Sequence, residues 1–198
     1  SDETKQLLER FERRCVLITG HRRESFGGGM DRICTAIRTL ARRHRDLDWI
    51  YPVHLNPQVQ GPVRRLLADE PNVHLLAPQG YESFVALMHR ATLILTDSGG
   101  VQEEAPALGK PTLVMRDKTE RTEGLGGGVE LVGTSTERII AGVERLLADP
   151  AEYERMSTAR SPYGDGTAAE LIVDQLAREL IHGERREDAC GESQRRAA

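Results

Sequence analysis

The chain has 198 residues, of which 38% are hydrophobic and 29% are charged. This length predicts one domain, or one domain with a tail, and the composition is typical of a soluble globular protein. The 27 basic and 31 acidic residues give a net charge of −4. That balance argues against a general nucleic-acid or membrane-surface binder, because such proteins need a basic face.

No apolar run approaches the roughly 18 residues of a membrane helix. The first residues, Ser-Asp-Glu-Thr-Lys, lack the apolar core of a signal peptide. The three cysteines, Cys15, Cys34 and Cys190, share no disulfide or metal-site spacing. We therefore expect a reduced, cytoplasmic protein with no membrane partner, no metal ion and no cofactor.

Short apolar runs alternate with helical patterns along the chain. The predicted strands are, in order, Cys15–Thr19, Trp49–Val53, Val73–Leu76, Leu93–Thr96, Thr112–Met115 and Val129–Val132. The predicted helices are Met30–Arg43, Val59–Ala68, Tyr81–His89, Val101–Leu108, Ser135–Leu147, Ala151–Ala159 and Thr167–Ile181. Thr134 and Glu137 predict a capping box for the helix that begins at Ser135.

Six strands alternating with helices predict an α/β fold: a doubly wound, Rossmann-like parallel sheet covered by helices on both faces. We expect residues 14–182 to form this domain. Residues 1–13 are interpreted as a linker or the start of an interdomain helix, and residues 183–198 as a disordered polar tail. Ligands of such sheets bind at the carboxyl ends of the strands, so the site is expected in the loops that follow them.

The loop after the fourth strand reads Asp97-Ser98-Gly99-Gly100-Val101-Gln102-Glu103-Glu104. Glycines at a strand-to-helix turn allow a ligand to approach the backbone, and the free N–H groups of the new helix favour an anion, most often a phosphate. A carboxylate one turn later can accept hydrogen bonds from a ribose diol. The segment predicts a nucleotide site, and an ordinary packing turn is the alternative.

Unusual side chains also follow the first, second and fifth strands. The first of these loops reads Gly20-His21-Arg22-Arg23-Glu24. Arginine suits phosphate recognition, and histidine can donate to a phosphate oxygen or protonate a departing one. The alternative is a loop ion pair such as Arg23–Glu24 beside a surface histidine. His54 taken alone is interpreted as structural, and Arg121 lies either where it could reach a phosphate or in a solvated loop.

Six longer motifs stand in series between about Arg14 and Leu180. They are Gly20-His21-Arg22-Arg23-Glu24, Tyr51-Pro52-Val53-His54-Leu55-Asn56-Pro57, Leu95-Thr96-Asp97-Ser98-Gly99-Gly100-Val101-Gln102-Glu103-Glu104-Ala105-Pro106, Leu108-Gly109-Lys110-Pro111, Val114-Met115-Arg116-Asp117 with Thr119-Glu120-Arg121, and Pro162-Tyr163-Gly164-Asp165-Gly166. Their order and spacing resemble those of the non-hydrolysing UDP-N-acetylglucosamine 2-epimerases. The resemblance implies a B-type glycosyltransferase-like fold of two Rossmann-like domains, this chain being the carboxyl-terminal, UDP-binding one.

The resemblance also implies residue roles in binding UDP. Ser98, Gly99 and Gly100 match the residues that hold the diphosphate. Glu104 matches the ribose-binding carboxylate, and Phe84 lies where the family builds its uracil pocket. The expected partner is therefore UDP or UDP-N-acetylglucosamine.

Further matched residues concern catalysis and activation. His21 and Arg121 match active-site residues near the phosphates. Arg22, Glu24 and His54 match contacts to a second, activating UDP-N-acetylglucosamine in several bacterial members. The resemblance also implies a role in cell-envelope polysaccharide synthesis and a homodimer.

The family's isomerase reaction inverts carbon 2 of the sugar and gives UDP-N-acetylmannosamine, by elimination of UDP and its re-addition. Removing the weakly acidic C2 proton requires a positioned base. The family's candidate carboxylates lie in the amino-terminal domain, which this chain lacks, so we expect it to bind UDP and not to epimerise alone. Two alternatives are a UDP-sugar-dependent glycosyltransferase domain and a non-enzymatic UDP-sugar-binding regulatory domain.

One loop departs from the family pattern. Thr122 replaces a proline after Arg121, and the stretch Gly124–Gly128 is rich in glycine and one residue short. The departure predicts a more mobile loop that holds Arg121 less firmly.

Overall fold

The computed structural model describes residues 1–164 and 166–180, and its contacts divide the chain after Tyr163 into two units. The strands of the first unit are β1 (Cys15–Thr19), β2 (Asp48–Pro52), β3 (Val73–Leu76), β4 (Leu93–Thr96), β5 (Thr112–Val114) and β6 (Val129–Leu131). Its α-helices are α1 (Asp2–Glu9), α2 (Gly28–Arg43), α3 (Pro57–Leu67), α4 (Tyr81–Arg90), α5 (Gly99–Glu104), α6 (Thr136–Ala148) and α7 (Pro150–Ser157). In the second unit, residues 168–180 are helical.

The six strands form one sheet in the order β3-β2-β1-β4-β5-β6, and every pair is parallel. This is the strand order of a doubly wound Rossmann-like domain, so the predicted fold class is confirmed. The order reverses between β1 and β4, which pair directly, with Ile18 opposite Leu95. The loops after these two strands therefore diverge and leave a crevice at the carboxyl edge of the sheet.

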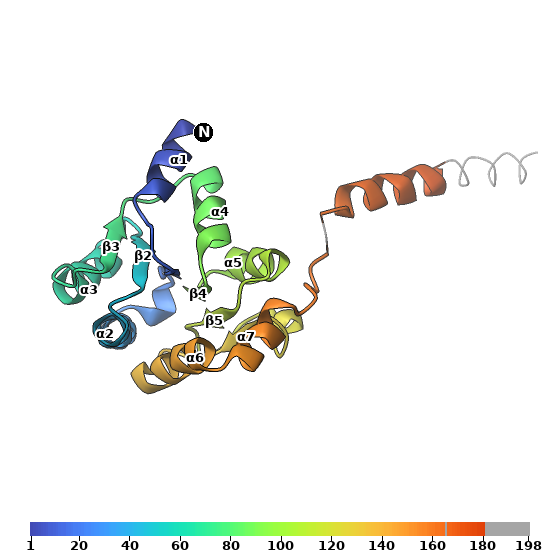
Figure 1. Cartoon of the computed structure of the whole chain (residues 1–198). Helices are drawn as coiled ribbons and strands as arrows, with labels where there is room; N and C mark the ends of the chain where they lie inside the picture. The colour runs from blue at the N-terminus through green and yellow to red at the C-terminus, as the bar shows by residue number, and fades with distance from the viewer. Residues whose placement is uncertain (165, 181–198) are drawn as a thin grey trace, which may run out of the picture. The chain divides into compact units, whose positions relative to one another are not determined.

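Two apolar cores hold the helices against the sheet. Alternate residues of β1 point to opposite faces, as expected for a strand. Val16 and Ile18 enter the core formed with α2, α3, α6 and α7, whereas Cys15 and Leu17 enter the core formed with α1, α4 and α5. Figure 1 shows these two groups of helices on either side of the strands. Because all the strands are parallel, they all end at the same edge of the sheet, and the loops that follow them gather there.

Three strands differ by one residue from their predicted ends. Val53, Met115 and Val132 lie just beyond β2, β5 and β6, although each is buried and its N–H still donates to a carbonyl of the neighbouring strand. The apolar pattern therefore extends one residue past the ladder that defines the strand.

The predicted helices needed larger corrections. The predicted helix Val101–Leu108 begins earlier, at Gly99, and becomes a 3-10 helix over Ala105–Leu108. The predicted capping box was wrong: Ser135 is the N-cap of α6, and its hydroxyl accepts from the N–H of Arg138 at 3.4 Å. A helix, α1, forms within residues 1–13.

None of the helices that the structure describes is long and apolar enough to cross a membrane.

Several predictions stay open. The predicted tail 183–198, Ile181 and Cys190 lie outside the described residues. The predicted domain boundaries remain predictions.

Candidate functional site

A cavity of about 280 Å³ opens at the carboxyl edge of the sheet, beside the point where the strand order reverses. We name it the first cavity. Its lining comes from the loops after β1, β2, β3 and β4 and from the adjoining helices: Thr19, Gly20, His21, Pro52, His54, Pro78, Gln79, Phe84, Ser98 and Val101. Proline, phenylalanine and valine give it apolar walls, and His21 and Ser98 add polar groups. This mixture is typical of a small-molecule site.

A second cavity, of about 450 Å³, shares His21 and His54 with the first. It is lined by His21, Arg22, Arg23, Glu24, Phe26, His54 and Asn56. The rings of His21 and His54 stack with their centroids 5.3 Å apart and their planes 17° apart. These two residues therefore form a wall shared by both cavities.

The Gly-Gly turn begins a helix without a side-chain cap. Ser98 is the N-cap residue of α5, and across the part of the chain that the structure describes its hydroxyl makes no capping bond to the first turn. The turn is fixed instead from beneath, because the N–H of Ser98 donates to Oγ1 of Thr96 at 2.9 Å. That hydroxyl also lies 2.7 Å from Oγ1 of Thr19, which ties β4 to β1. The N-terminal N–H groups of α5 are thus left for another acceptor.

Asp97, directly after β4, organises the loop after β1. Its side chain is fully buried, and Oδ2 accepts from the backbone N–H groups of His21 at 2.7 Å and Arg22 at 2.8 Å. Gly20 fits the tight approach of this loop to β2: a Cβ there would meet the hydroxyl of Tyr51 at 2.9 Å. The sequence did not single out Asp97 as a site residue. An acidic residue immediately after a buried strand, beside a glycine turn, is the signal that could have found it.

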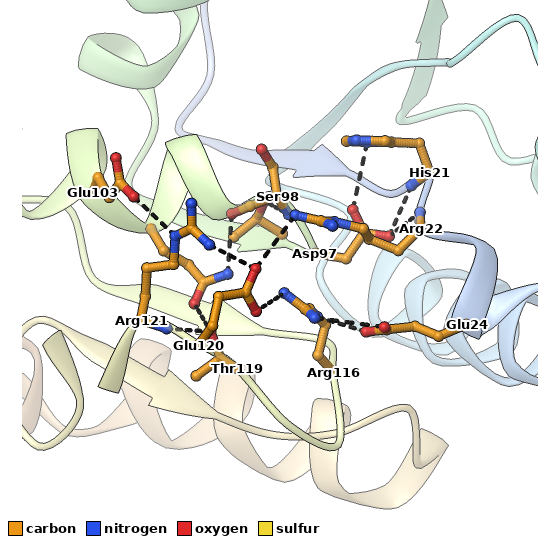
Figure 2. Close-up of polar contacts among 12 residues, drawn as sticks. His21, Arg22, Glu24, Asp97, Ser98, Glu103, Arg116, Thr119, Glu120 and Arg121 are labelled. Atoms are coloured by element: carbon orange, nitrogen blue, oxygen red, sulfur yellow. Dashed lines mark hydrogen bonds and ion pairs between the residues drawn. The ribbon is translucent and has the colours of Figure 1, made fainter. Parts of the chain in front are cut away.

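Arg121 reaches the Gly-Gly turn from the loop after β5 (Figure 2). Its guanidinium group lies against Gly99, where a Cβ would meet Cζ at 2.9 Å. Nε donates to Glu103 at 2.8 Å, and a terminal nitrogen donates to Glu120 at 2.6 Å. The hydrogen bond from Arg121 to Glu103 is the main cause of the raised pKa of this guanidinium group. The prediction that Arg121 can reach the turn is consistent with this placement.

Arg116 joins the loops after β1 and β5. Its side chain is buried, with 8% exposed; Nε donates to Glu24 at 2.5 Å and a terminal nitrogen donates to Glu120 at 3.0 Å. Burial lowers the pKa of Arg116, but its bonds to Glu24 and Glu120 outweigh burial and leave the pKa raised. The pKa of Glu120 is lowered, first by a backbone hydrogen bond and then by Arg116 and Arg121. The raised pKa of Arg116 and the lowered pKa of Glu120 both favour the charged forms that pair here.

A second, uncharged link supports the same loop. The buried amide of Gln102 donates to the carbonyl of Ser98 at 3.1 Å and accepts from Oγ1 of Thr119 at 2.7 Å. Oγ1 of Thr119 in turn accepts from the N–H of Arg121 at 3.2 Å. This chain of bonds fixes the backbone of Arg121 relative to the turn at Ser98.

Glu104 lies on α5, outside the lining of the first cavity. Its Oε2 accepts from the hydroxyl of Tyr81 at 3.2 Å, and the negative charge of Glu104 is the main cause of a raised pKa of that phenol. Tyr81 begins α4, the helix that also carries Phe84. The two predicted nucleoside contacts, Glu104 and Phe84, are thus connected through one helix.

Six of the predicted site residues line a cavity, and two of these, His21 and His54, line both; Gly99, Gly100, Glu104 and Arg121 line neither. His21, Phe84 and Ser98 line the first cavity, and Arg22 and Glu24 line the second. The alternative of an Arg23–Glu24 ion pair was wrong, because Glu24 pairs with Arg116, 92 residues away in sequence. Glu120 and Arg116 were not singled out from the sequence. The position of Arg116 directly after the predicted apolar strand Thr112–Met115 is the signal that could have marked it.

Within residues 1–164 and 166–180, no group of three or more His, Cys, Asp or Glu side chains is arranged to hold a metal ion. The candidate site combines the uncapped start of α5 and an apolar cavity with two groups of charged or polar side chains. These are the buried or half-buried Arg22, Arg116 and Arg121, and the ring of His21 beside the buried Asp97.

Comparison with known proteins identifies the family of this chain. The family model described as UDP-N-acetylglucosamine 2-epimerase matches residues 1–177. A probable UDP-N-acetylglucosamine 2-epimerase from Ralstonia nicotianae is 58% identical over 163 residues, which are 82% of this chain and 44% of the relative. The UDP-N-acetylglucosamine 2-epimerase of Escherichia coli K12 is 54% identical over 171 residues, which are 86% of this chain and 46% of the relative.

Solved structures agree with the sequence comparison. The UDP-GlcNAc 2-epimerase from Neisseria meningitidis bound to UDP-GlcNAc has a TM-score of 0.85 and 43% identity, covering 89% of this chain and 48% of that one. A Staphylococcus aureus protein in complex with UDP has a TM-score of 0.82 and 38% identity, covering 86% of this chain and 47% of that one. The chain spans about half the length of the curated relatives it matches. It therefore belongs to the UDP-N-acetylglucosamine 2-epimerase family.

Proposed function

We propose that this chain is the UDP-binding half of an enzyme that interconverts UDP-N-acetylglucosamine and UDP-N-acetylmannosamine. The observation that carries the proposal is the meeting of three features at one edge of the sheet. These are the uncapped start of α5 at Ser98, the Arg121 guanidinium over Gly99, and the apolar cavity beside them. The relatives from Neisseria meningitidis and Staphylococcus aureus that bind UDP-GlcNAc or UDP support the choice of ligand.

In this proposal the diphosphate binds at the Gly-Gly turn. The N–H groups of Gly99 and Gly100 and the hydroxyl of Ser98 donate to its oxygens, since a helix start favours an anion. Arg121 exchanges a carboxylate partner for the diphosphate, because a guanidinium fork recognises phosphate as well as carboxylate. His21 donates from the other side of the turn.

The nucleoside occupies the first cavity. Phe84 packs against the uracil ring, and Glu104 accepts hydrogen bonds from the ribose hydroxyl groups through the oxygen not engaged by Tyr81. Arg22, Glu24 and His54 contact a second nucleotide sugar in the second cavity, whose volume and arginine lining suit a phosphorylated ligand.

His21 and Arg121 are the residues of this chain that we assign to catalysis. They stabilise the anionic UDP as its bond to the sugar breaks, and they retain it for re-addition. The proton at C2 is moved by carboxylates of the other half of the enzyme. Homodimer formation, a cytoplasmic location and a role in cell-envelope polysaccharide synthesis remain predictions.

Calorimetry with UDP tests the binding proposal directly. We expect the chain to bind UDP more tightly than ADP or CDP, because in this proposal the first cavity holds a uracil ring. Absence of heat with UDP, together with no protection against thermal unfolding, would contradict the proposal.

An epimerase assay on the chain alone tests the division of labour. We expect no conversion of UDP-N-acetylglucosamine above background. Turnover by the isolated chain would show that the proton transfer does not need the other half.

A further inference from the structure

The buried carboxylate of Asp97 has one oxygen in use and one without a partner. Oδ2 accepts two backbone N–H groups of the loop after β1. Oδ1 is equally buried, and among the described residues it has no hydrogen-bond partner. Leaving a polar oxygen unsatisfied in the interior is costly, so a hydrogen-bond donor is expected to face it.

The ring of His21 is placed to be that donor. Nδ1 of His21 lies 3.5 Å from Oδ1 of Asp97, within ion-pair range and slightly beyond a normal hydrogen bond. Figure 2 shows the ring directly over the carboxylate. A shift of the ring by a few tenths of an ångström would bring Nδ1 to hydrogen-bond distance. The stacked ring of His54 lies 5.3 Å away, centroid to centroid, and supports the ring of His21 from the side.

His54 itself is fixed in a different tautomer. Its Nδ1 accepts from the N–H of Asn56 at 3.1 Å, so its own proton is on Nε2. His54 therefore does not compete for Oδ1. Arg22, the next residue of the same loop, is directed toward Glu120, with 3.9 Å between the nearest charged atoms.

We propose that Asp97 is a positioning residue that acts through His21: it holds a proton on Nδ1 and so presents Nε2 to the first cavity. The proposal rests on the assignment of UDP to that cavity. With Nδ1–H directed at a buried carboxylate, Nε2 is the atom left to meet a diphosphate oxygen. The carboxylate also stabilises positive charge on the ring as the anion arrives. A merely structural Asp97 would hold the loop backbone and leave the tautomer of His21 undetermined.

The first test reads the tautomer without any ligand. In a chain labelled with ¹⁵N-histidine, we expect the Nδ1 resonance of His21 at neutral pH to be that of a protonated nitrogen. In Asp97→Asn, the side-chain oxygen accepts the two backbone N–H groups, and its amide donates to His21, so Nδ1 becomes an acceptor. An acceptor-type Nδ1 in the unsubstituted chain would overturn the proposal, whether or not any variant folds.

Asp48 and His74 provide the matched control. Oδ1 of Asp48 lies 3.0 Å from Nε2 of His74, and Asp48 is also buried, but this pair is at the amino end of β2. Asp48→Asn is expected to change the spectrum of His74 and to leave His21 and the UDP affinity unchanged. A tautomer change at His21 in this variant would contradict a local effect of Asp97.

The second test is a double-mutant cycle on UDP affinity. We expect Asp97→Asn to weaken UDP binding about tenfold when His21 is present, and by less than about twofold in a His21→Ala background. Equal losses in both backgrounds would show that Asp97 only anchors the loop, and would overturn the proposal. If the unsubstituted chain does not bind UDP, the proposed function fails, whereas the nitrogen spectrum still decides the role of Asp97.

Discussion

The guanidinium group of Arg121 lies so close to the backbone of Gly99 that a Cβ atom at residue 99 would meet its Cζ at 2.9 Å. The two residues come from different strand-end loops and are separated by 22 positions. Because residue 99 is a glycine, the guanidinium group of Arg121 can lie against the start of α5. This contact gives a direct test of the proposed diphosphate site.

Gly99→Ala is expected to weaken UDP binding about tenfold, because the new methyl group displaces Arg121 from the turn. The free energy of unfolding should change little, since the displaced atoms are the end of a flexible side chain. Calorimetry and chemical denaturation measure the two effects. Gly61→Ala is the control: it lies in α3 with nothing within 4 Å of its new Cβ, and should stabilise the chain by about 0.5–1 kcal/mol without affecting UDP.

Arg116→Ala is expected to lower both stability and UDP affinity. The loss of stability should be about 1 kcal/mol, because Glu24 and Glu120 are half exposed to water. The loss of UDP affinity should be about tenfold, since two carboxylates near an anionic ligand lose their cation. Adding Glu120→Gln should recover part of the affinity.

The control for Arg116 is Arg42, which pairs with the buried Glu70 away from both cavities. Arg42→Ala should cost similar stability and leave UDP binding unchanged. If Arg116→Ala destabilises the chain but binds UDP normally, the contacts of Arg116 with Glu24 and Glu120 do not contribute to UDP binding.

Glu104→Gln is expected to weaken the binding of UDP more than that of 2′-deoxy-UDP. A carboxylate accepts from both ribose hydroxyl groups, and the 2′-deoxy ligand lacks one of those donors. The ratio of the two affinities should therefore fall toward one in the variant, as measured by calorimetry. Tyr81→Phe, which removes the neighbouring donor, should keep the preference for the ribonucleotide; an unaltered ratio in Glu104→Gln would remove the ribose role.

The buried thiols predict a loss of stability at alkaline pH. Burial raises the pKa of Cys15 to about 11 and that of Cys34 to about 12, from an ordinary value near 9. Above pH 9 the unfolded chain releases these protons and the folded chain keeps them. The free energy of unfolding should therefore fall by about 1.4 kcal/mol per thiol for each pH unit between pH 9 and 11.

Cys34→Ala isolates this effect. Its stability should show a shallower decline than the unsubstituted chain above pH 9 and a parallel profile below pH 8.5, as measured by urea denaturation. Parallel profiles through pH 11 would show that the Cys34 thiol does not contribute.

The fold was largely predictable because strand and helix patterns depend on local sequence. The β-branched and apolar run at Leu93–Thr96, for example, predicted β4 with its bounds. The start of α5 was placed two residues late, because glycine has low helix propensity and only the turn geometry favours helix there.

The sequence indicated which loops and side chains to consider for the candidate site, but not how those side chains contact one another. The loop motifs pointed to His21, Ser98 and Arg121, which the sheet topology gathers at one edge. The pairing of Glu24 with Arg116 could not be predicted, since it joins residues 92 apart whose approach depends on the packing of the whole sheet. The unpartnered Oδ1 of Asp97 could not be predicted either, because its burial depends on how the surrounding loops pack in three dimensions.

The arginines of the site already have carboxylate partners. Arg22, Arg116 and Arg121 stand beside Glu24, Glu103 and Glu120, with Asp97 beneath them. Such a neutralised site gives an incoming anion little long-range attraction, so electrostatic steering should add little to the association rate. In the proposed site, discrimination among nucleotides would therefore depend mainly on their dissociation rates. A ligand that pairs well with Arg121 should dissociate slowly, whereas one that pairs poorly should dissociate quickly as Arg121 returns to Glu103 and Glu120.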